Sequence, residues 1–173
     1  MSLTGKRIAI LVEANYEDLE LWYPLLRLRE EGADTFVVGT GNESYPSKHG
    51  YVVKVDAEAD TVSANQFDAI IVPGGYAPDR LRRYPSVLKL IKDADEQGKI
   101  IGAICHAAWV LISAQILKGR TITCIKAIKD DVVNAGANYV DKEVVRDGNL
   151  ITSRTPDDLP AFGAALVSAL KEV

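Results

Sequence analysis

The chain has 173 residues, of which 47% are hydrophobic and 25% charged, and its formal net charge is −4 at pH 7. This balance fits one globular domain over residues 1–173, and it excludes the broad basic surface that nucleic-acid binding needs. No apolar run approaches the ~20 residues of a membrane helix. The start, MSLTGKR, passes directly into a strand-like run, which is not the pattern of a signal peptide. Two cysteines make no disulfide framework, so we expect a cytoplasmic protein with reduced thiols.

In the first half of the chain, strand-like runs alternate with helical ones. Ile, Leu and Val fill residues 6–13, which suits a strand buried on both faces. A helix is expected over 15–33, with Asn15 as its N-cap and a kink or distortion at Pro24. The other expected elements here are a strand at 34–39, an extended pair or hairpin arm at 50–62, and a strand at 67–75 that ends in a Gly-Gly turn.

The second half continues the alternation. An amphipathic helix is expected over 79–99, with a break at Pro85. The elements expected after it are a strand at 100–105, a helix at 106–117, a strand at 120–125, a short helix at 128–136, a hairpin at 144–153 and a helix at 156–173. This order predicts a three-layer α/β sandwich with a mostly parallel sheet and helices on both faces, as in flavodoxin-like folds.

In such sheets the ligand lies beyond the carboxyl ends of the strands. Cys105 follows one of these strands, on a tight turn into a helix, and small residues surround it. It can be a buried core thiol or a nucleophile presented on an elbow. A helix N-terminus would lower its pKa below the usual ~8.5, which favours the nucleophile. Cys124 has no such position, and we interpret it as a core residue.

Three further features lie at the same predicted edge. His106 can cap its own helix or act in catalysis, and its backbone N–H can form half of an oxyanion hole. Gly74 and Gly75 can be a plain turn or can present a second N–H to the same oxyanion. Glu17 can stabilise the helix dipole, or it can point across the edge to Cys105 as a partly desolvated carboxyl that holds a proton.

Several segments, in order and at similar spacing, resemble the PfpI-type intracellular peptidases of the ThiJ/PfpI branch of the class I glutamine amidotransferase-like superfamily. These segments are ANYEDLEL, KHGYVVKVD, FDAIIVPGGYAPDRLR, GAICHA, LISAQILKGR, IKDDVVNAGANYVD and VVRDGNLITSRTPDDL. The resemblance covers nearly the whole chain.

The resemblance implies roles for individual residues. Cys105 matches the family nucleophile, and Glu17 the carboxyl that hydrogen-bonds to it. His106 matches the base of the peptidase-like members. Asp79 matches a position usually held by Glu, which a neighbouring subunit donates to the His, and the shorter Asp reduces that reach. Gly75 and His106 match the oxyanion-hole N–H groups.

The resemblance also implies a homo-oligomer, either a dimer or a hexamer, with the site near a subunit interface. It assigns no chemistry to His49. The late His-x-Glu of the glutaminase relatives is missing, so no glutaminase activity is expected. We expect no metal and no cofactor, because the chain has only two histidines and no G-x-G-x-x-G spacing at the Gly-Gly turn.

Three functions remain open from the sequence, and the first two, taken as one class of cysteine-dependent enzyme of stress metabolism, are favoured over the third. The first is a cysteine-dependent glyoxalase or protein deglycase that acts on small carbonyl compounds. The second is a cysteine protease in which Cys105, His106 and Asp79 hydrolyse peptides. The third is a non-enzymatic redox sensor or chaperone-like stress protein that uses an oxidisable Cys105. The expected partners are therefore a small carbonyl or peptide substrate and copies of the same chain, with no nucleic acid and no membrane.

Overall fold

A computed structural model, which describes residues 2–173, contains a seven-stranded sheet in the order β10-β11-β7-β6-β1-β2-β5. All neighbouring pairs are parallel except β10 with β11. Its strands are β1 (Arg7–Leu11), β2 (Asp34–Gly39), β5 (Ala57–Glu58), β6 (Ala69–Val72), β7 (Ile100–Ile104), β10 (Val144–Asp147) and β11 (Leu150–Ser153). The predicted mostly parallel sheet is confirmed.

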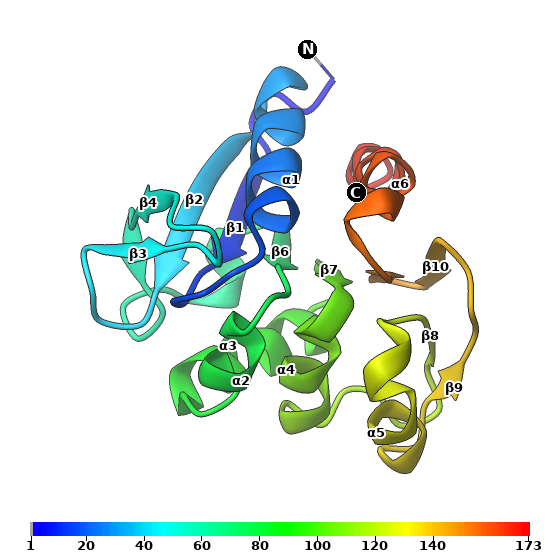
Figure 1. The fold of residues 1–173 in the computed structure, drawn as a ribbon. Coiled ribbons are helices and arrows are strands. Elements are labelled where there is room, and N and C mark those ends of the chain that lie inside the picture. Colours follow the sequence, from blue (N-terminus) through cyan, green and yellow to red (C-terminus); the bar gives the residue numbers. More distant parts are fainter. Residues whose placement is uncertain (1) are drawn as a thin grey trace.

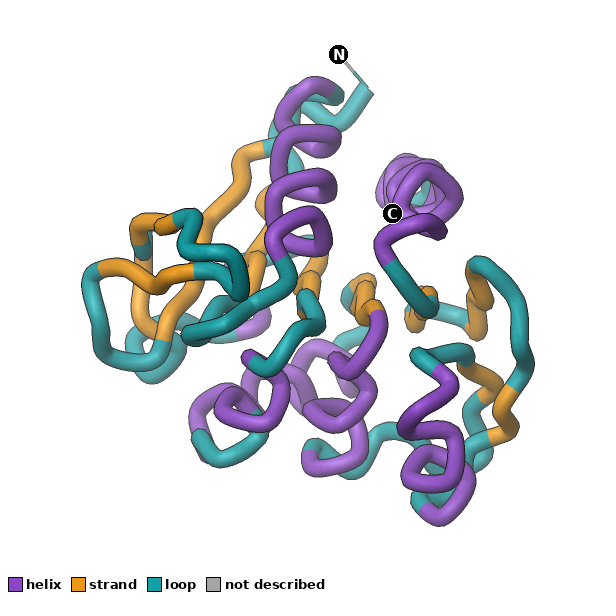
Figure 2. The backbone as a smooth tube through the Cα atoms, viewed as in Figure 1, coloured by secondary structure: helices purple, strands orange, loops and turns teal. Residues whose placement is uncertain are grey.

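Helices cover both faces of this sheet (Figure 1). Helices α1 (Asp18–Glu30) and α6 (Leu159–Lys171) pack together on one face. The other helices lie across the sheet from them, with α3 against β6 and β7, and are α2 (Ala77–Leu81), α3 (Pro85–Glu96), α4 (Ala108–Ser113) and α5 (Lys129–Asn134). Figure 2 shows the same three layers by element type. The predicted three-layer α/β sandwich is confirmed.

Two short strand pairs and four 3-10 turns complete the described chain. The pairs are β3 (Ser44–Pro46) with β4 (Val52–Lys54), and β8 (Thr121–Ile122) with β9 (Asn138–Tyr139). The turns are η1 (Ala64–Gln66), η2 (Cys105–Ala107), η3 (Lys126–Ile128) and η4 (Pro156–Asp158). The predicted arm at 50–62 is thus divided, since β4 pairs with β3 whereas β5 joins the main sheet.

The start of the first helix differs from the prediction. The helix begins at Asp18 with Glu17 as its N-cap, and Asn15 lies outside it with a positive φ of 62°. Pro24 is accommodated inside the helix, which continues to Glu30. The break at Pro85 is confirmed, because Pro85 is the first residue of α3, where its missing N–H is tolerated.

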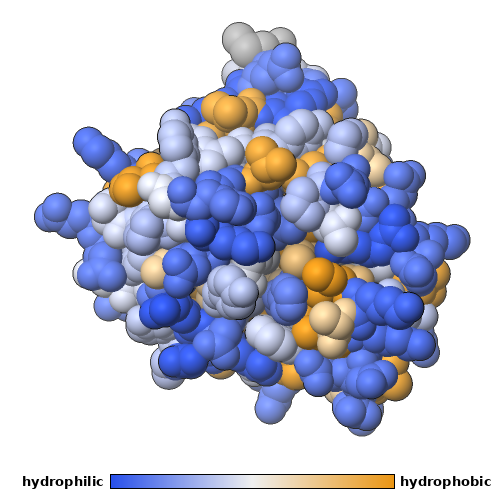
Figure 3. Space-filling model, viewed as in Figure 1, coloured by the Kyte–Doolittle hydropathy of each residue, from blue (hydrophilic) through white to orange (hydrophobic). Residues whose placement is uncertain are grey.

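The surface is mainly polar on the side shown in Figure 3, with separate apolar groups among the charged ones. Among the described residues, no helix is long and apolar enough to cross a membrane.

Gly102 shows how closely the core is packed. A Cβ at this position in β7 would lie 2.8 Å from Leu166 and 2.9 Å from Ile71. Both neighbours are fully buried and cannot move without displacing others.

We therefore expect Gly102→Ala to lower the free energy of unfolding by about 1–3 kcal/mol, as overpacking does. Urea unfolding followed by circular dichroism measures this change. Ser168→Ala, at an exposed position of α6, is the matched control and should leave stability nearly unchanged. A Gly102→Ala protein as stable as the wild type would contradict this description of the core.

Candidate active site

Three neighbouring strand ends meet at one point of the sheet edge. Strands β7, β6 and β1 lie side by side, so the segments that follow them converge. Backbone hydrogen bonds join these segments: the Glu17 N–H donates to the Gly74 carbonyl at 3.2 Å, and the Tyr76 N–H donates to the Asn15 carbonyl at 2.9 Å. The predicted convergence is present.

Cys105 occupies the turn between β7 and α4. Its φ is 63°, in the left-handed region that residues other than glycine seldom adopt, so the backbone around it is strained. This is the geometry of a nucleophile elbow. The residue is only 7% exposed, however, so the elbow does not present the thiol to solvent as expected.

The carboxyl group beside Cys105 belongs to Glu20. Glu20 is completely buried, and its Oε2 accepts a 2.7 Å hydrogen bond from the Gly74 N–H. A Cβ placed on Gly74 would lie 2.4 Å from this Oε2 and 2.7 Å from the Cys105 Cβ. The carboxyl and the thiol residue therefore pack over the same glycine, and no larger residue fits there.

The prediction that Glu17 contacts the thiol is wrong in its geometry. The Glu17 carboxylate instead accepts a 3.1 Å hydrogen bond from the Lys48 ammonium. The prediction took Asn15 as the N-cap of the helix, which put Glu17 in its first turn. With the start at Asp18, Glu20 lies in the first turn and three residues after Glu17, on the same helix face. The signal that could have found it is the second acidic residue of the YEDLE stretch.

Burial controls the proton on Glu20. It raises the pKa of this carboxyl to about 8, with a further increase from the negative charge of Glu17. The second carboxyl oxygen, Oε1, is buried and has no hydrogen-bond donor beside it among the described residues, so a negative charge on it would be poorly compensated. Glu20 is therefore mainly neutral at pH 7.

The thiol pKa also departs from the prediction. Burial, followed by the negative charge of Glu20, raises the pKa of Cys105 to about 12. Hydrogen bonds from the backbone N–H groups of His106 and Gly75 act in the opposite direction, because they favour the thiolate. The resting group is a thiol, and it needs a base to become a nucleophile.

The imidazole of His106 lies beside this thiol. Its Nδ1 lies 3.3 Å from the Cys105 sulfur, and its ring packs against Trp109 with centroids 5.1 Å apart. Burial, aided by the positive charge of Lys48, lowers the pKa of His106. The imidazole is therefore neutral at pH 7 and able to accept the thiol proton.

The N–H groups predicted for the oxyanion hole divide into two kinds. Those of Gly75 and His106 lie close enough to the sulfur to favour its thiolate form. That of Gly74 is already bonded to Glu20, so the prediction of an oxyanion-hole role for Gly74 is corrected. Gly75 has a φ of 78°, and a Cβ there would lie 2.4 Å from the Glu17 nitrogen, so glycine is required.

Asp79 lies on α2 and pairs with Arg83, four residues later. Its side chain is half exposed, and His106 has no hydrogen bond to it within the described chain. Cys124 is 1% exposed, which agrees with its interpretation as a core residue.

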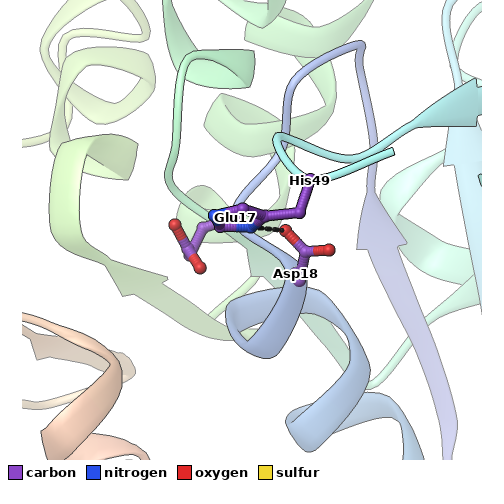
Figure 4. Close-up of side chains that lie close together, drawn as sticks. All are labelled: Glu17, Asp18 and His49. Atoms are coloured by element: carbon purple, nitrogen blue, oxygen red, sulfur yellow. Dashed lines mark hydrogen bonds and ion pairs between the residues drawn. The ribbon is translucent and has the colours of Figure 1, made fainter. Parts of the chain in front are cut away.

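His49 lies near the site mouth with two acidic residues. Ligand atoms of Glu17, Asp18 and His49 lie within 4.8 Å of one another and could in principle hold a metal ion. Figure 4 shows that Asp18 and His49 face each other, whereas the Glu17 carboxylate points away from that pair. Asp18 accepts hydrogen bonds from Ser47 Oγ at 2.5 Å and from His49 Nδ1 at 2.7 Å. Each of these three side chains therefore already has a polar partner within the protein.

Comparison with known proteins shows the family of the chain. The model of the DJ-1/PfpI family matches residues 6–169. The chain belongs to the DJ-1/PfpI family. It is 42% identical to "Deglycase PfpI" of Pyrococcus furiosus over 165 residues, which are 95% of this chain and 99% of the relative. It is 41% identical over 168 residues to YraA of Bacillus subtilis, provisionally named a cysteine protease, at 96% and 99% coverage.

Solved structures of the family have the same fold. Drosophila melanogaster DJ-1beta superposes with a TM-score of 0.91 at 29% identity, over 97% of this chain and 91% of that one. A two-domain protein of Anabaena variabilis with DJ-1/ThiJ/PfpI-like and ferritin-like domains gives a TM-score of 0.94 at 42% identity. The match covers 95% of this chain and 50% of the two-domain protein.

The Glu20 proton has a measurable effect on stability. Because the pKa of Glu20 is higher in the folded state, the folded protein binds more protons than the unfolded chain between about pH 4.5 and 8. The contribution of Glu20 to the free energy of unfolding should therefore fall as pH rises through this window. In Glu20→Gln this part of the pH dependence should disappear.

Chemical denaturation at a series of pH values measures this difference. Glu96→Gln, at an exposed position of α3, is the control and should retain the wild-type pH dependence. If Glu20→Gln loses stability with pH as steeply as the wild type, Glu20 does not hold a proton in the folded state.

Proposed function

We propose that the chain is a cysteine-dependent enzyme of the deglycase or glyoxalase type, with Cys105 as the nucleophile. The observation that carries this proposal is the buried Glu20 carboxyl, which packs with Cys105 over Gly74 and keeps its proton to about pH 8. A neutral acid beside a thiol is suited to carbonyl addition, because the oxygen that becomes negative can be protonated in the site.

The proposed reaction uses the residues described above. The His106 imidazole accepts the proton of the thiol, the sulfur forms a bond to the aldehyde carbon, and Glu20 donates a proton to the carbonyl oxygen. The product of this step is a hemithioacetal. The Glu20 carboxylate then removes the proton of this carbon and returns it to the adjacent carbonyl carbon. His106 gives its proton to the adjacent carbonyl oxygen and takes the hydroxyl proton of the hemithioacetal, which yields a thioester. Water cleaves the thioester to a hydroxy acid, with one water proton passing to Glu20 and the His106 proton returning to the Cys105 sulfur.

The backbone N–H groups of Gly75 and His106 support the anionic stages. Both favour the thiolate form of the sulfur, and in the proposed reaction they hold either the thiolate or the oxyanion next to it. The net reaction adds one water to an α-oxoaldehyde and needs no oxidant or reductant.

Peptide hydrolysis is a second candidate, favoured by the 3.3 Å contact between Cys105 and His106. In that reaction Cys105 forms an acyl-enzyme, and His106 needs a carboxylate that orients it. Asp79 of the same chain pairs with Arg83 and cannot take that role at the same time. A peptidase would therefore require Asp79 of a neighbouring copy, and its activity would depend on assembly.

An oligomer and a cytoplasmic location complete the proposal. Large apolar side chains are exposed on α1 and near β4, namely Leu19, Leu26, Tyr51 and Val52. A second copy of the chain is the proposed partner for this surface, in a dimer or in a hexamer built from dimers. Both cysteines are free, and removal of reactive carbonyl compounds would place the enzyme in the stress response of the cytoplasm.

The direct test replaces each cysteine in turn. Cys105→Ser should lose at least 100-fold in the rate of methylglyoxal removal, because a serine hydroxyl is far less readily deprotonated than the thiol it replaces. Cys124→Ser, the control, should keep most of the rate. Lactate formation, measured by chromatography, reports the product.

A Cys105→Ser protein that still converts methylglyoxal would remove this proposal. A wild type that converts neither methylglyoxal nor peptides, but is selectively oxidised at Cys105 by peroxide, would favour the redox-sensing function instead.

A further inference from the structure

The ion pair between Glu17 and Lys48 has no part in the steps above, yet it lies at the mouth of the site. Lys48 Nζ is 3.1 Å from Glu17 Oε2 and 6.0 Å from the centre of the Tyr76 ring. The backbone N–H of Lys48 donates to the Tyr16 carbonyl at 2.8 Å, which fixes the loop beside the start of α1.

Glu17, the N-cap of α1, and Glu20, in the first turn of α1, both form hydrogen bonds with Gly74. The Glu17 N–H donates to the Gly74 carbonyl, and the Gly74 N–H donates to the Glu20 carboxyl. Glu17 and Glu20 are three residues apart and share a helix face, so their carboxyl groups are neighbours. The position of Glu17 relative to Glu20 is thus set by backbone contacts and does not depend on the ion pair.

We propose that the Glu17–Lys48 ion pair, through its two opposite charges, sets the pH range over which Glu20 keeps its proton, and so the pH range of the Cys105 enzyme. Part of this inference rests on the proposed function, since the pH range of catalysis has meaning only if Cys105 is a nucleophile. The control of the Glu20 proton stands without it.

The charges around Glu20 support the proposal. The groups that face it are Glu17 from its own helix, Lys48 from the loop at the site mouth, and Cys105 from η2. Glu17 favours the protonated form of Glu20, and Lys48 opposes it. Lys48 also disfavours protonation of His106, which lies beyond Cys105. The pair therefore acts on both the acid and the base of the site.

The two partners of one ion pair should then have opposite effects. Glu17→Gln removes the negative charge and leaves Lys48 uncompensated, so Glu20 should lose its proton at lower pH. Lys48→Met removes the positive charge, so Glu20 should keep its proton to higher pH. A pair that only held the loop in place would give the same result from either substitution.

The test measures kcat/KM for methylglyoxal from pH 5 to 10. We expect the bell-shaped profile to move down by about 0.5 pH unit or more in Glu17→Gln, and up by a similar amount in Lys48→Met. The controls Lys89→Met and Asp93→Asn break an ion pair on α3, at positions 89 and 93, by the same charge changes. Both should keep the wild-type profile.

A second readout separates this proposal from the proposed function. Alkylation of Cys105 by iodoacetamide, followed by mass spectrometry across the same pH range, needs no turnover. Ionised Glu20 suppresses the thiolate, so the rise of the alkylation rate with pH should level off where Glu20 loses its proton. This point should lie at lower pH in Glu17→Gln and at higher pH in Lys48→Met than in the wild type. In a Glu20→Gln background these shifts should shrink.

Shifts of the same sign in Glu17→Gln and Lys48→Met, or no shift in either, would overturn the proposal. The alkylation profile can move down in Glu17→Gln and up in Lys48→Met while neither the wild type nor any variant converts methylglyoxal. In that case the ion pair controls Glu20, and the proposed reaction is the part that fails.

Discussion

The active site depends on one packing constraint, which is the space above Gly74. Glu20 and Cys105 both occupy the volume that a Cβ on this residue would need. The Gly74 N–H orients the Glu20 carboxyl, and the turn after β7 brings the Cys105 backbone into a strained conformation against the same point. Because the two groups are buried together, their protonation states are linked.

This linkage changes the chemistry from that of an exposed reactive thiolate. Burial favours neutral forms of both groups, so the resting site holds a carboxylic acid and a thiol rather than two anions. The proton of the thiol must leave during the reaction, and the neutral imidazole of His106 is within reach of the sulfur. In the proposed reaction the acid, the base and the nucleophile come from only two segments, the start of α1 and η2.

Much of this arrangement follows from sequence patterns. The alternation of apolar strands and helices gave the parallel sheet, and the small residues around Cys105 indicated the elbow. The carboxyl was assigned to the wrong glutamate because the register of α1 depends on where the helix begins, and Asn15 is a good N-cap by type. Its positive φ, and the backbone bonds that tie the segment to Gly74 and Tyr76, depend on contacts between distant parts of the chain.

Burial was the other quantity that the sequence could not supply. The elbow motif predicts a turn, whereas the exposure of the sulfur depends on side chains from α1, which reach it only in the folded state. The most direct measurement of the central claim is an infrared spectrum of the folded protein, compared with that of Glu20→Gln. A C=O stretching band of a protonated carboxyl should be present at pH 7, absent in the variant, and lost near pH 8 to 9. If Glu20 gives only the carboxylate bands at pH 7, the site holds no neutral acid.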